Sequence, residues 1–249
     1  MKKELNVIFL IAATLVGTGC RTWHAQEPSV QNKRLTEWLK DYALFSYWTP
    51  EFDEDGTPIE WSPPLTREER EAGNKAREAL QQMGTNAIPS LMRMLLSNKK
   101  SESELAEAGF NALGPAARAA VPALLGMLET NFTLACSTLG AIGPAAEEAT
   151  PALLKRISPT NGPPALSAMQ ALSRIHGQPE LAVPALTQQL VLCGQEPAES
   201  FWAELCLMGL AGYGQQAQAA IPAIEVFLNS PDEHVRLCAT NTLKRVRKP

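Results

Sequence analysis

A short acidic stretch has the residue types and spacing of a metal-binding loop. Glu51, Asp53 and Asp55 are spaced two apart and precede Gly56, as carboxylates at positions 1, 3 and 5 precede a glycine at position 6 in a calcium loop. Such a loop also needs a bidentate glutamate at position 12, where this chain has Ser62. A tight turn that uses Asp55 and Gly56 accounts for the same residues without a metal. We therefore expect a turn here and no bound calcium.

Other side chains that could bind a metal or act as nucleophiles are few. His234 and Cys238 are four residues apart and would share one helix face, but two ligands do not complete a site and no third is evident. His24 and His176 have no partner at a useful spacing. The sequence lacks a phosphate-binding loop, a serine nucleophile elbow, a metalloprotease helix and a Cys-x-x-Cys pair. It assigns no catalytic residue, no metal ligand and no cofactor, and we expect a protein that is not an enzyme.

The chain begins with the pattern of an export signal. Two lysines precede an apolar run at residues 7–16, and small residues lead to Cys20. The run is short for a transmembrane helix, which needs about 20 residues. This order resembles a bacterial lipoprotein signal, a family in which the cysteine thiol receives a diacylglyceryl group and becomes the new N-terminus. The resemblance implies a signal peptide at 1–19, a lipid on Cys20 and a membrane-anchored place in the cell envelope, on the periplasmic or extracellular face. The alternative is an ordinary cleaved signal with an incidental cysteine.

A five-fold repeat fills most of the remaining sequence. Each copy has a proline between small and apolar residues, at Pro89, Pro122, Pro151, Pro184 and Pro222. The spacings of 33, 29, 33 and 38 residues are typical of a solenoid. Proline suits the first turn of a helix, and a Leu or Ile two residues later begins a buried stripe. Four positions further on, the stripe continues with Leu95, Leu128, Ile157, Leu190 and Leu228.

Another helix precedes each of these segments. A small residue is followed by apolar residues at +4 and +7, which is the spacing of one helix face. These columns start at Ala76, Ala106, Ala135, Ala168 and Cys206, and the glycines that follow them are Gly84, Gly114, Gly143, Gly177 and Gly214. Glycine just past a helix end adopts a left-handed conformation with little strain. A last column starts at Ala239 with no partner helix after it, so residues 66–249 predict five helix pairs and one closing helix.

The pattern resembles the HEAT-repeat family, including bacterial variants similar to those in phycobilin lyases, over about residues 66–247. The resemblance implies an all-α fold, an α-solenoid whose first helices line the convex side and whose second helices line the concave side. It says little about function, because one fold serves many functions. We favour an interaction scaffold without a reaction centre, and an enzyme or enzyme-assisting factor that uses the groove remains the alternative. With 22 Lys+Arg against 26 Asp+Glu, we expect no nucleic-acid partner.

The segment at residues 20–65 has a different composition, rich in aromatic residues. Its apolar positions follow the i, i+3, i+4, i+7 spacing of an amphipathic helix. They are Leu35, Trp38, Leu39 and Tyr42. Residues 49–64 are rich in Pro, Asp and Glu and predict a loop. We expect the helix to cap the first repeat, because terminal repeats need a different outer face. An aromatic recognition patch is the alternative.

A candidate groove comes from residues four and five positions after each proline, which we expect to point away from the buried stripe. The fourth positions are Arg93, Gly126, Lys155, Gln188 and Val226, and the fifth are Met94, Met127, Arg156, Gln189 and Phe227. The candidate binding residues among them are Arg93, Met94, Met127, Lys155, Arg156, Gln188, Gln189 and Phe227. Arg pairs with carboxylates in a forked geometry and Met adapts to irregular surfaces, so an acidic peptide or protein is the expected partner. The alternative is a solvated surface without a ligand.

The remaining cysteines and the basic end of the chain have simple explanations. Cys136, Cys193, Cys206 and Cys238 could form two disulfides, but three of them fall inside apolar helical patterns, where Cys acts as a small apolar residue. Lys244, Arg245, Arg247 and Lys248 follow the closing helix, where positive charge is favourable at the C-terminal end. A contact of these four with anionic lipid or cell wall is the alternative.

Overall fold

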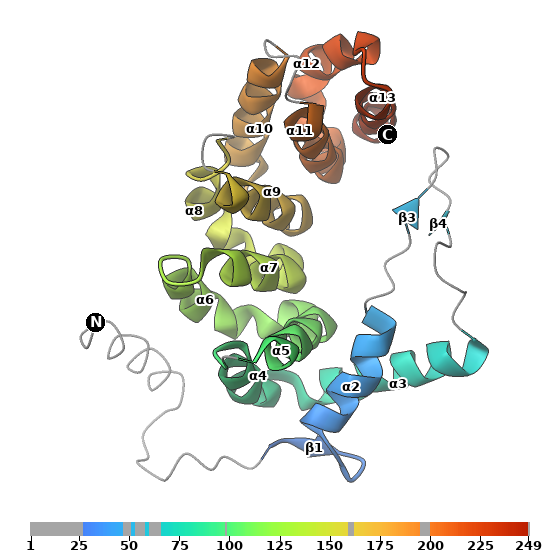
Figure 1. The fold of residues 1–249 in the computed structure, drawn as a ribbon, viewed down its shortest axis with the longest axis vertical. Helices are drawn as coiled ribbons and strands as arrows, with labels where there is room; N and C mark the ends of the chain where they lie inside the picture. Colours follow the sequence, from blue (N-terminus) through green and yellow to red (C-terminus); the bar gives the residue numbers. More distant parts are fainter. Residues whose placement is uncertain are drawn as a thin grey trace. The chain divides into compact units, whose positions relative to one another are not determined.

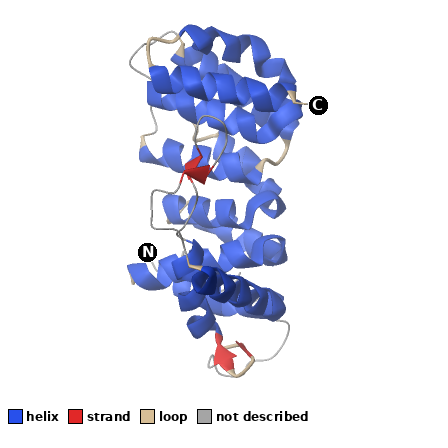
Figure 2. Ribbon diagram, turned by 90° about the vertical axis from the view of Figure 1, so that its right-hand side faces the viewer, coloured by secondary structure: helices blue, strands red, loops and turns tan. Residues whose placement is uncertain are grey.

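The computed structural model describes residues 27–46, 51–52, 58–59, 66–97, 99–158, 162–194 and 200–248. These residues are almost all helical, with two pairs of two-residue strands (Figure 2), so the all-α prediction is confirmed. Residues 1–19, for which a signal peptide was predicted, and Cys20, the predicted site of lipid attachment, lie outside the described residues. The chain forms two compact units, Met1–Glu51 with Pro58–Thr130 and Phe52–Thr57 with Asn131–Pro249. We call them the N-terminal and C-terminal units and describe each separately (Figure 1).

The N-terminal unit contains the predicted amphipathic helix and the first two helix pairs. Its elements are β1 (Ser29–Val30), β2 (Lys33–Arg34), α2 (Leu35–Ser46), α3 (Arg67–Met83), the 3-10 helix η1 (Gly84–Ala87), α4 (Ile88–Leu95), α5 (Lys100–Leu113), η2 (Gly114–Ala120) and α6 (Val121–Met127). Helix α2 packs against both α3 and α5 (Figure 1). Trp38 and Tyr42 are buried there, so these two aromatic side chains belong to the core and form no exposed patch.

The C-terminal unit contains the other three pairs and the closing helix. Its elements are α7 (Phe132–Ile142), η3 (Gly143–Ala149), α8 (Thr150–Leu154), α9 (Pro163–Ile175), α10 (Pro179–Cys193), α11 (Ser200–Tyr213), η6 (Gly214–Ala220), α12 (Ile221–Val226), η7 (Phe227–Asn229) and α13 (Glu233–Arg247). The first helices α7, α9, α11 and α13 contact one another in chain order. The second helices α8, α10 and α12 do the same, so the unit has two helical layers.

The segment expected to be a loop contains two short strands. Strands β3 (Glu51–Phe52) and β4 (Pro58–Ile59) pair with each other, which corrects the prediction of a loop over 49–64. Strand pairing satisfies backbone groups that an open loop would leave to water. Asp53, Asp55 and Gly56 of the calcium-like stretch lie outside the described residues.

Helix starts and ends follow local chemistry. Helix α3 begins with a capping box in which the Thr66 hydroxyl accepts a hydrogen bond from the Glu69 amide at 3.2 Å. The Glu69 carboxylate in turn accepts from the Thr66 amide at 2.8 Å. Such caps typically contribute about 1 kcal/mol. The predicted proline lies in the first turn of α4, α6, α8 and α12, where its missing N–H leaves no bond unmade.

The fourth helix pair departs from this pattern. Gly84, Gly114, Gly143 and Gly214 have positive φ as predicted, but in the fourth copy the residue with positive φ is His176, at 47°, instead of Gly177. The inserted histidine ends α9 one residue before the expected glycine. No 3-10 helix follows it, and α10 begins at Pro179, so Pro184 lies inside the helix and not in its first turn. The prediction was wrong at both positions, because the inserted residue changes the route from first to second helix.

The predicted core columns are confirmed with one exception. All six small residues that start a column are buried, as are the apolar residues at +4 and +7 after them. The stripe residues Leu124 and Leu153 are fully buried. Leu228 is the exception, at 38 % exposed, while Phe227 is buried in its place. The α-helix α12 ends at Val226, and the tighter 3-10 turn η7 brings the third residue after Ile224 to the core instead of the fourth.

Candidate functional site

The candidate binding residues of the N-terminal unit are divided between surface and core. Arg93 on α4 is exposed, and its guanidinium donates a hydrogen bond to the Ser90 hydroxyl at 3.0 Å. Met94 is half-buried. Met127 at the end of α6 is only 2 % exposed. The surface of α4 therefore offers Arg93 and part of Met94, and Met127 is not available to a ligand.

The C-terminal unit presents two cations and an amide on neighbouring second helices. Lys155 and Arg156 are exposed directly after α8. The Arg156 guanidinium lies 5.4 Å from the centroid of the Phe132 ring, which is within cation–π range. Gln188 on α10 is exposed, whereas Gln189 is half-buried. Because α8 contacts α10, Lys155, Arg156 and Gln188 lie on adjacent helices of one layer.

Met127 and Phe227 correct the predicted groove. Phe227 is 7 % exposed, so both of these fifth-position side chains face the core. The fifth position after proline is three residues after the Leu or Ile that starts the stripe, and residues three apart share a helix face. The fifth position therefore belongs with the buried stripe. Arg156 is exposed because α8 ends at Leu154, before it.

The C-terminal unit also exposes large apolar side chains that the sequence analysis did not single out. On the second helices they are Leu181, Val191 and Leu192 of α10, Val226 of α12 and Leu228 of η7. Val226 is the most exposed, at 64 %. A Cβ added to Gly194, just past α10, would lie 3.3 Å from the Phe227 ring, so the ends of α10 and α12 are adjacent. Val191 and Leu192 belong to one of these neighbouring helix ends, and Val226 and Leu228 to the other.

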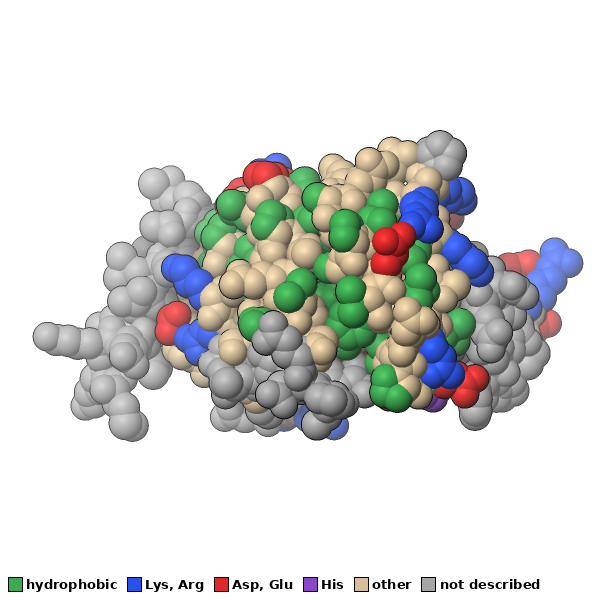
Figure 3. Space-filling view, turned by 90° about the horizontal axis from the view of Figure 1, so that it is seen from above, with side chains coloured by type: hydrophobic (Ala, Val, Ile, Leu, Met, Phe, Trp, Pro, Cys, Tyr) green, Lys and Arg blue, Asp and Glu red, His purple; other side chains and the backbone are tan. Residues whose placement is uncertain are grey.

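The view from above looks onto the end of the C-terminal unit that holds α10, α12 and α13. Hydrophobic side chains occur in several places across this face, and basic side chains lie toward its edges on both sides (Figure 3). We define the second-helix surface as the exposed side chains of Lys155, Arg156, Gln188, Val191, Leu192, Val226 and Leu228. It combines positive charge on α8 with apolar area on α10, α12 and η7. Helix α11 adds exposed Phe201 and Met208 in the other layer.

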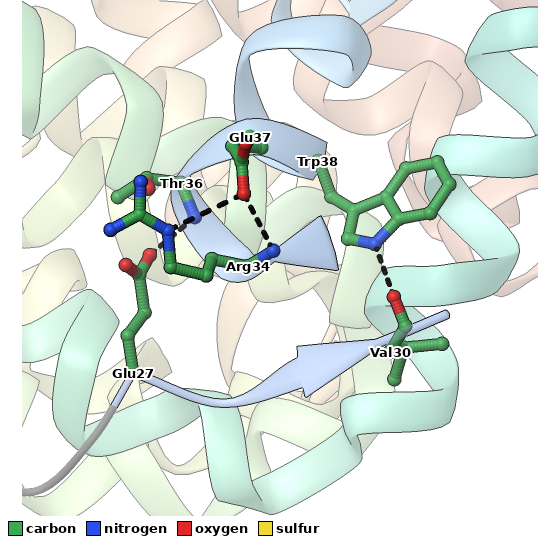
Figure 4. Close-up of polar contacts among 6 residues, drawn as sticks. All are labelled: Glu27, Val30, Arg34, Thr36, Glu37 and Trp38. Atoms are coloured by element: carbon green, nitrogen blue, oxygen red, sulfur yellow. Dashed lines mark hydrogen bonds and ion pairs between the residues drawn. The ribbon is translucent and has the colours of Figure 1, made fainter. Parts of the chain in front are cut away.

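The most polar cluster of the N-terminal unit is structural. The Trp38 indole N–H donates to the Val30 carbonyl at 3.1 Å, and the Glu37 carboxylate accepts from the Arg34 amide at 2.9 Å (Figure 4). The Thr36 amide donates to the Glu27 carboxylate (Figure 4). The bond from the Arg34 backbone is the main reason that the pKa of Glu37 is lowered. These contacts fix β1, β2 and the start of α2, and they leave no side chain directed at a ligand.

A second set of contacts attaches α2 to the first helix pairs. The Tyr42 hydroxyl donates to the Asn111 amide oxygen at 2.8 Å, and the Arg77 guanidinium lies 5.6 Å from the centroid of the Tyr42 ring. Lys33 pairs with Asp41, and its ammonium lies 4.3 Å from the centroid of the Trp38 ring. These contacts secure the helix that was expected to act as a cap.

The part of the chain that the structure describes has no assembled site for metal binding or thiol chemistry. No group there brings together three His, Cys, Asp or Glu side chains that could hold a metal ion. His234 is exposed at the start of α13, and Cys238 is half-buried. Cys136, Cys193 and Cys206 are buried, and burial raises the pKa of Cys136 to about 12. A thiol with that pKa is protonated at neutral pH and is a poor nucleophile.

Comparisons with known proteins identify no family or similar structure for this chain. A scan against protein-family models found no match, and searches of curated proteins and of solved structures found none either. Within the described ranges, none of the helices has the length and apolarity that a membrane span requires.

Proposed function

We propose that the protein is an exported, membrane-anchored scaffold that binds another protein or peptide through its second helices. The proposed architecture is a HEAT-like α-solenoid of five helix pairs with a closing helix. The observation that carries the binding role is the second-helix surface. Soluble proteins rarely expose large apolar side chains in a group unless a partner covers them. Val191, Leu192, Val226 and Leu228 are exposed on α10, α12 and η7, and α10 contacts α8, which Lys155 and Arg156 follow.

The charge of this surface favours an acidic partner. Lys155 and Arg156 are exposed on the layer that also carries the apolar side chains. A partner segment with carboxylates at one end and apolar residues at the other would meet both parts. The apolar contacts would supply most of the binding energy, and the cations would set orientation and speed association.

Photo-crosslinking in envelope membranes tests the proposal directly. A photoreactive amino acid at Gln188 should capture a specific protein, and the same group at Gln218, exposed on η6, should not. Leu192→Asp with Val226→Asp should abolish capture. Met208→Asp, an equally exposed apolar position on the first helix α11, is the matched control and should retain it. Equal capture by the Leu192/Val226 variant and the Met208 variant would contradict the proposed surface.

Charge reversal tests the acidic character of the partner. Lys155→Glu and Arg156→Glu together should weaken binding while leaving the melting temperature nearly unchanged, because exposed positions tolerate substitution. The matched control reverses two exposed lysines outside the second helices, Lys75 and Lys244, and changes the net charge by the same amount. If both double variants bind the captured partner as the parent does, the acidic partner is ruled out.

The membrane anchor has an independent test. Mass spectrometry of the mature N-terminus should find a diacylglyceryl-modified Cys20 as the first residue. Cys20→Ala should remain unprocessed or be released from the membrane fraction. A mature chain that begins at another residue with an unmodified amine would exclude lipid anchoring.

A further inference from the structure

The short connection between α9 and α10 has an unusual backbone. Only His176, Gly177 and Gln178 separate the two helices, and both His176 and Gln178 have positive φ, at 47° and 48°. Residues with a Cβ are strained in this region. The corresponding connections η2, η3 and η6 are 3-10 helices that begin at a glycine with positive φ. We call residues 176–178 the α9–α10 junction.

The His176 imidazole is partly buried at this junction. Its Nε2 atom is buried and has no hydrogen-bond partner among the described residues. It lies against Gly212 of α11, where an added Cβ would collide with Nε2. The ring also contacts Tyr213 edge-on, with centroids 5.7 Å apart and planes at 76°. The pocket therefore fits a neutral imidazole that places a bare nitrogen against glycine.

The backbone of the junction is held from two other elements. The Gly177 carbonyl accepts a hydrogen bond from the Tyr213 hydroxyl of α11 at 3.0 Å and from the Thr150 hydroxyl of α8 at 3.4 Å. Gly177 is buried against Glu147 of η3, so closely that a Cβ would overlap the side chain of that residue. Displacement of His176 would therefore disturb contacts to α8, α11 and η3 together.

The charged groups around the junction would stabilise a protonated His176 imidazole only weakly. The elements packed here contribute Arg174 on α9, Glu147 and Glu148 on η3, Glu180 on α10 and Tyr213 on α11. Glu180 acts on Tyr213, whose pKa rises to about 12 mainly through burial and secondarily through this carboxylate. Burial lowers the pKa of His176, and a hydrogen bond with the Ser173 backbone only partly opposes the shift. None of these carboxylates has a hydrogen bond to Nε2.

We propose that the α9–α10 junction is an acid-sensitive latch, in which protonation of His176 at Nε2 expels the imidazole from its contact with Gly212 and Tyr213 and releases α10 from α11. The proton comes from solvent, and no other group changes charge. A buried imidazolium without an acceptor is unstable, and moving it into water satisfies the new N–H. Since α10 carries Gln188, Val191 and Leu192, opening the latch would rearrange part of the second-helix surface.

The direction of the pH effect follows from linkage. The folded-state pKa of His176 lies below its unfolded value, so the unfolded or opened state binds the proton more tightly. Above the unfolded pKa both states are neutral and stability does not depend on this group. As pH falls through the unfolded pKa toward the folded one, the closed latch loses stability, by up to tenfold in its equilibrium constant for each unit of difference.

Two measurements on the full mature chain test the latch. An NMR titration of the imidazole protons should give His176 a pKa below the ordinary histidine value of about 6.5. Hydrogen exchange, corrected for the intrinsic pH dependence, should show protection of α10 and α11 falling between pH 7.5 and pH 5, while α3 and α5 of the N-terminal unit keep theirs. Loss of protection equally in both units would point to general acid denaturation and overturn the latch.

Two variants test whether the His176 imidazole causes the pH dependence. His176→Asn keeps a residue that tolerates positive φ but cannot titrate, so α10 and α11 should lose their pH dependence. His234→Asn is the matched control and should retain it. If His176→Asn fails to fold, the NMR titration of the parent still decides. A His176 pKa at or above the ordinary histidine value would overturn the proposal, as would unchanged pH dependence in a folded His176→Asn protein. These outcomes do not depend on partner binding.

Discussion

Among the described residues, most ion pairs lie in the N-terminal unit, whereas most of the exposed large apolar side chains lie in the C-terminal unit. Arg67 and Glu71 pair on α3 at 2.8 Å, and Lys99 pairs with Glu102 at 2.9 Å. The C-terminal unit instead exposes Val191, Met208 and Val226. The buried columns of the two units are alike, so the difference lies in the surface alone. It indicates that the repeats share a structural core while the composition of their exposed surfaces differs.

Core truncation should have the largest effect and should be similar in the two units. Leu124→Ala and Leu153→Ala each remove a fully buried side chain from equivalent stripe positions. Each should lower the free energy of unfolding by about 2–5 kcal/mol. Urea denaturation measures the loss, and Leu96→Ala, an exposed leucine after α4, should cost far less. Tolerance of truncation at only one of the two sites would mean that the units do not share a core register.

Two tyrosine substitutions, one in each unit, should lower stability by an intermediate amount. Tyr213→Phe removes a donor from the buried Gly177 carbonyl, and an undersatisfied buried group costs about 1–3 kcal/mol. Tyr42→Phe removes a bond to Asn111, an exposed residue that can turn to water, so the cost should be about 1 kcal/mol or less. Hydrogen exchange of α11 measures the effect of Tyr213→Phe, and hydrogen exchange of α2 measures that of Tyr42→Phe. A larger cost for Tyr42→Phe would reverse the proposed ranking.

Surface ion pairs should give the smallest effect. Arg67→Ala breaks the pair with Glu71, but both side chains are largely exposed, and such pairs contribute little. The melting temperature should change by no more than about 1 °C, within the scatter expected for surface substitutions. Calorimetry at low and high salt checks this. A shift of several degrees would show that the charged surface of the N-terminal unit stabilises its fold.

The repeat made most of the fold predictable from sequence. A small residue followed by apolar residues at +4 and +7 identifies a helix face wherever it occurs, and every such column is buried. Errors arose where a helix was shorter than its pattern implied. Phe227 replaces Leu228 in the core because α12 gives way to a 3-10 turn, and the sequence pattern does not specify where that change occurs.

The candidate site was less predictable than the core. Arg93, Lys155, Arg156 and Gln188 are exposed as expected, but Met127 and Phe227 are not. Counting three residues from the stripe leucine would have assigned both to the core. The exposure of Val191 and Val226 depends on which neighbouring helices cover them, and hydrophobicity alone cannot give that information. The insertion of His176 before Gly177 was visible in the sequence, but its partly buried imidazole depends on Gly212, 36 residues away.

The succession of contacts from α7 to α9, α11 and α13 has a consequence for how the chain acquires its structure. Each helix meets partners that are near in sequence, so only short loops must close and folding should be fast. A completed helix pair also offers a ready surface for the next one. A chain that emerges from the ribosome N-terminus first can therefore gain structure one pair at a time, before its last helix has been made.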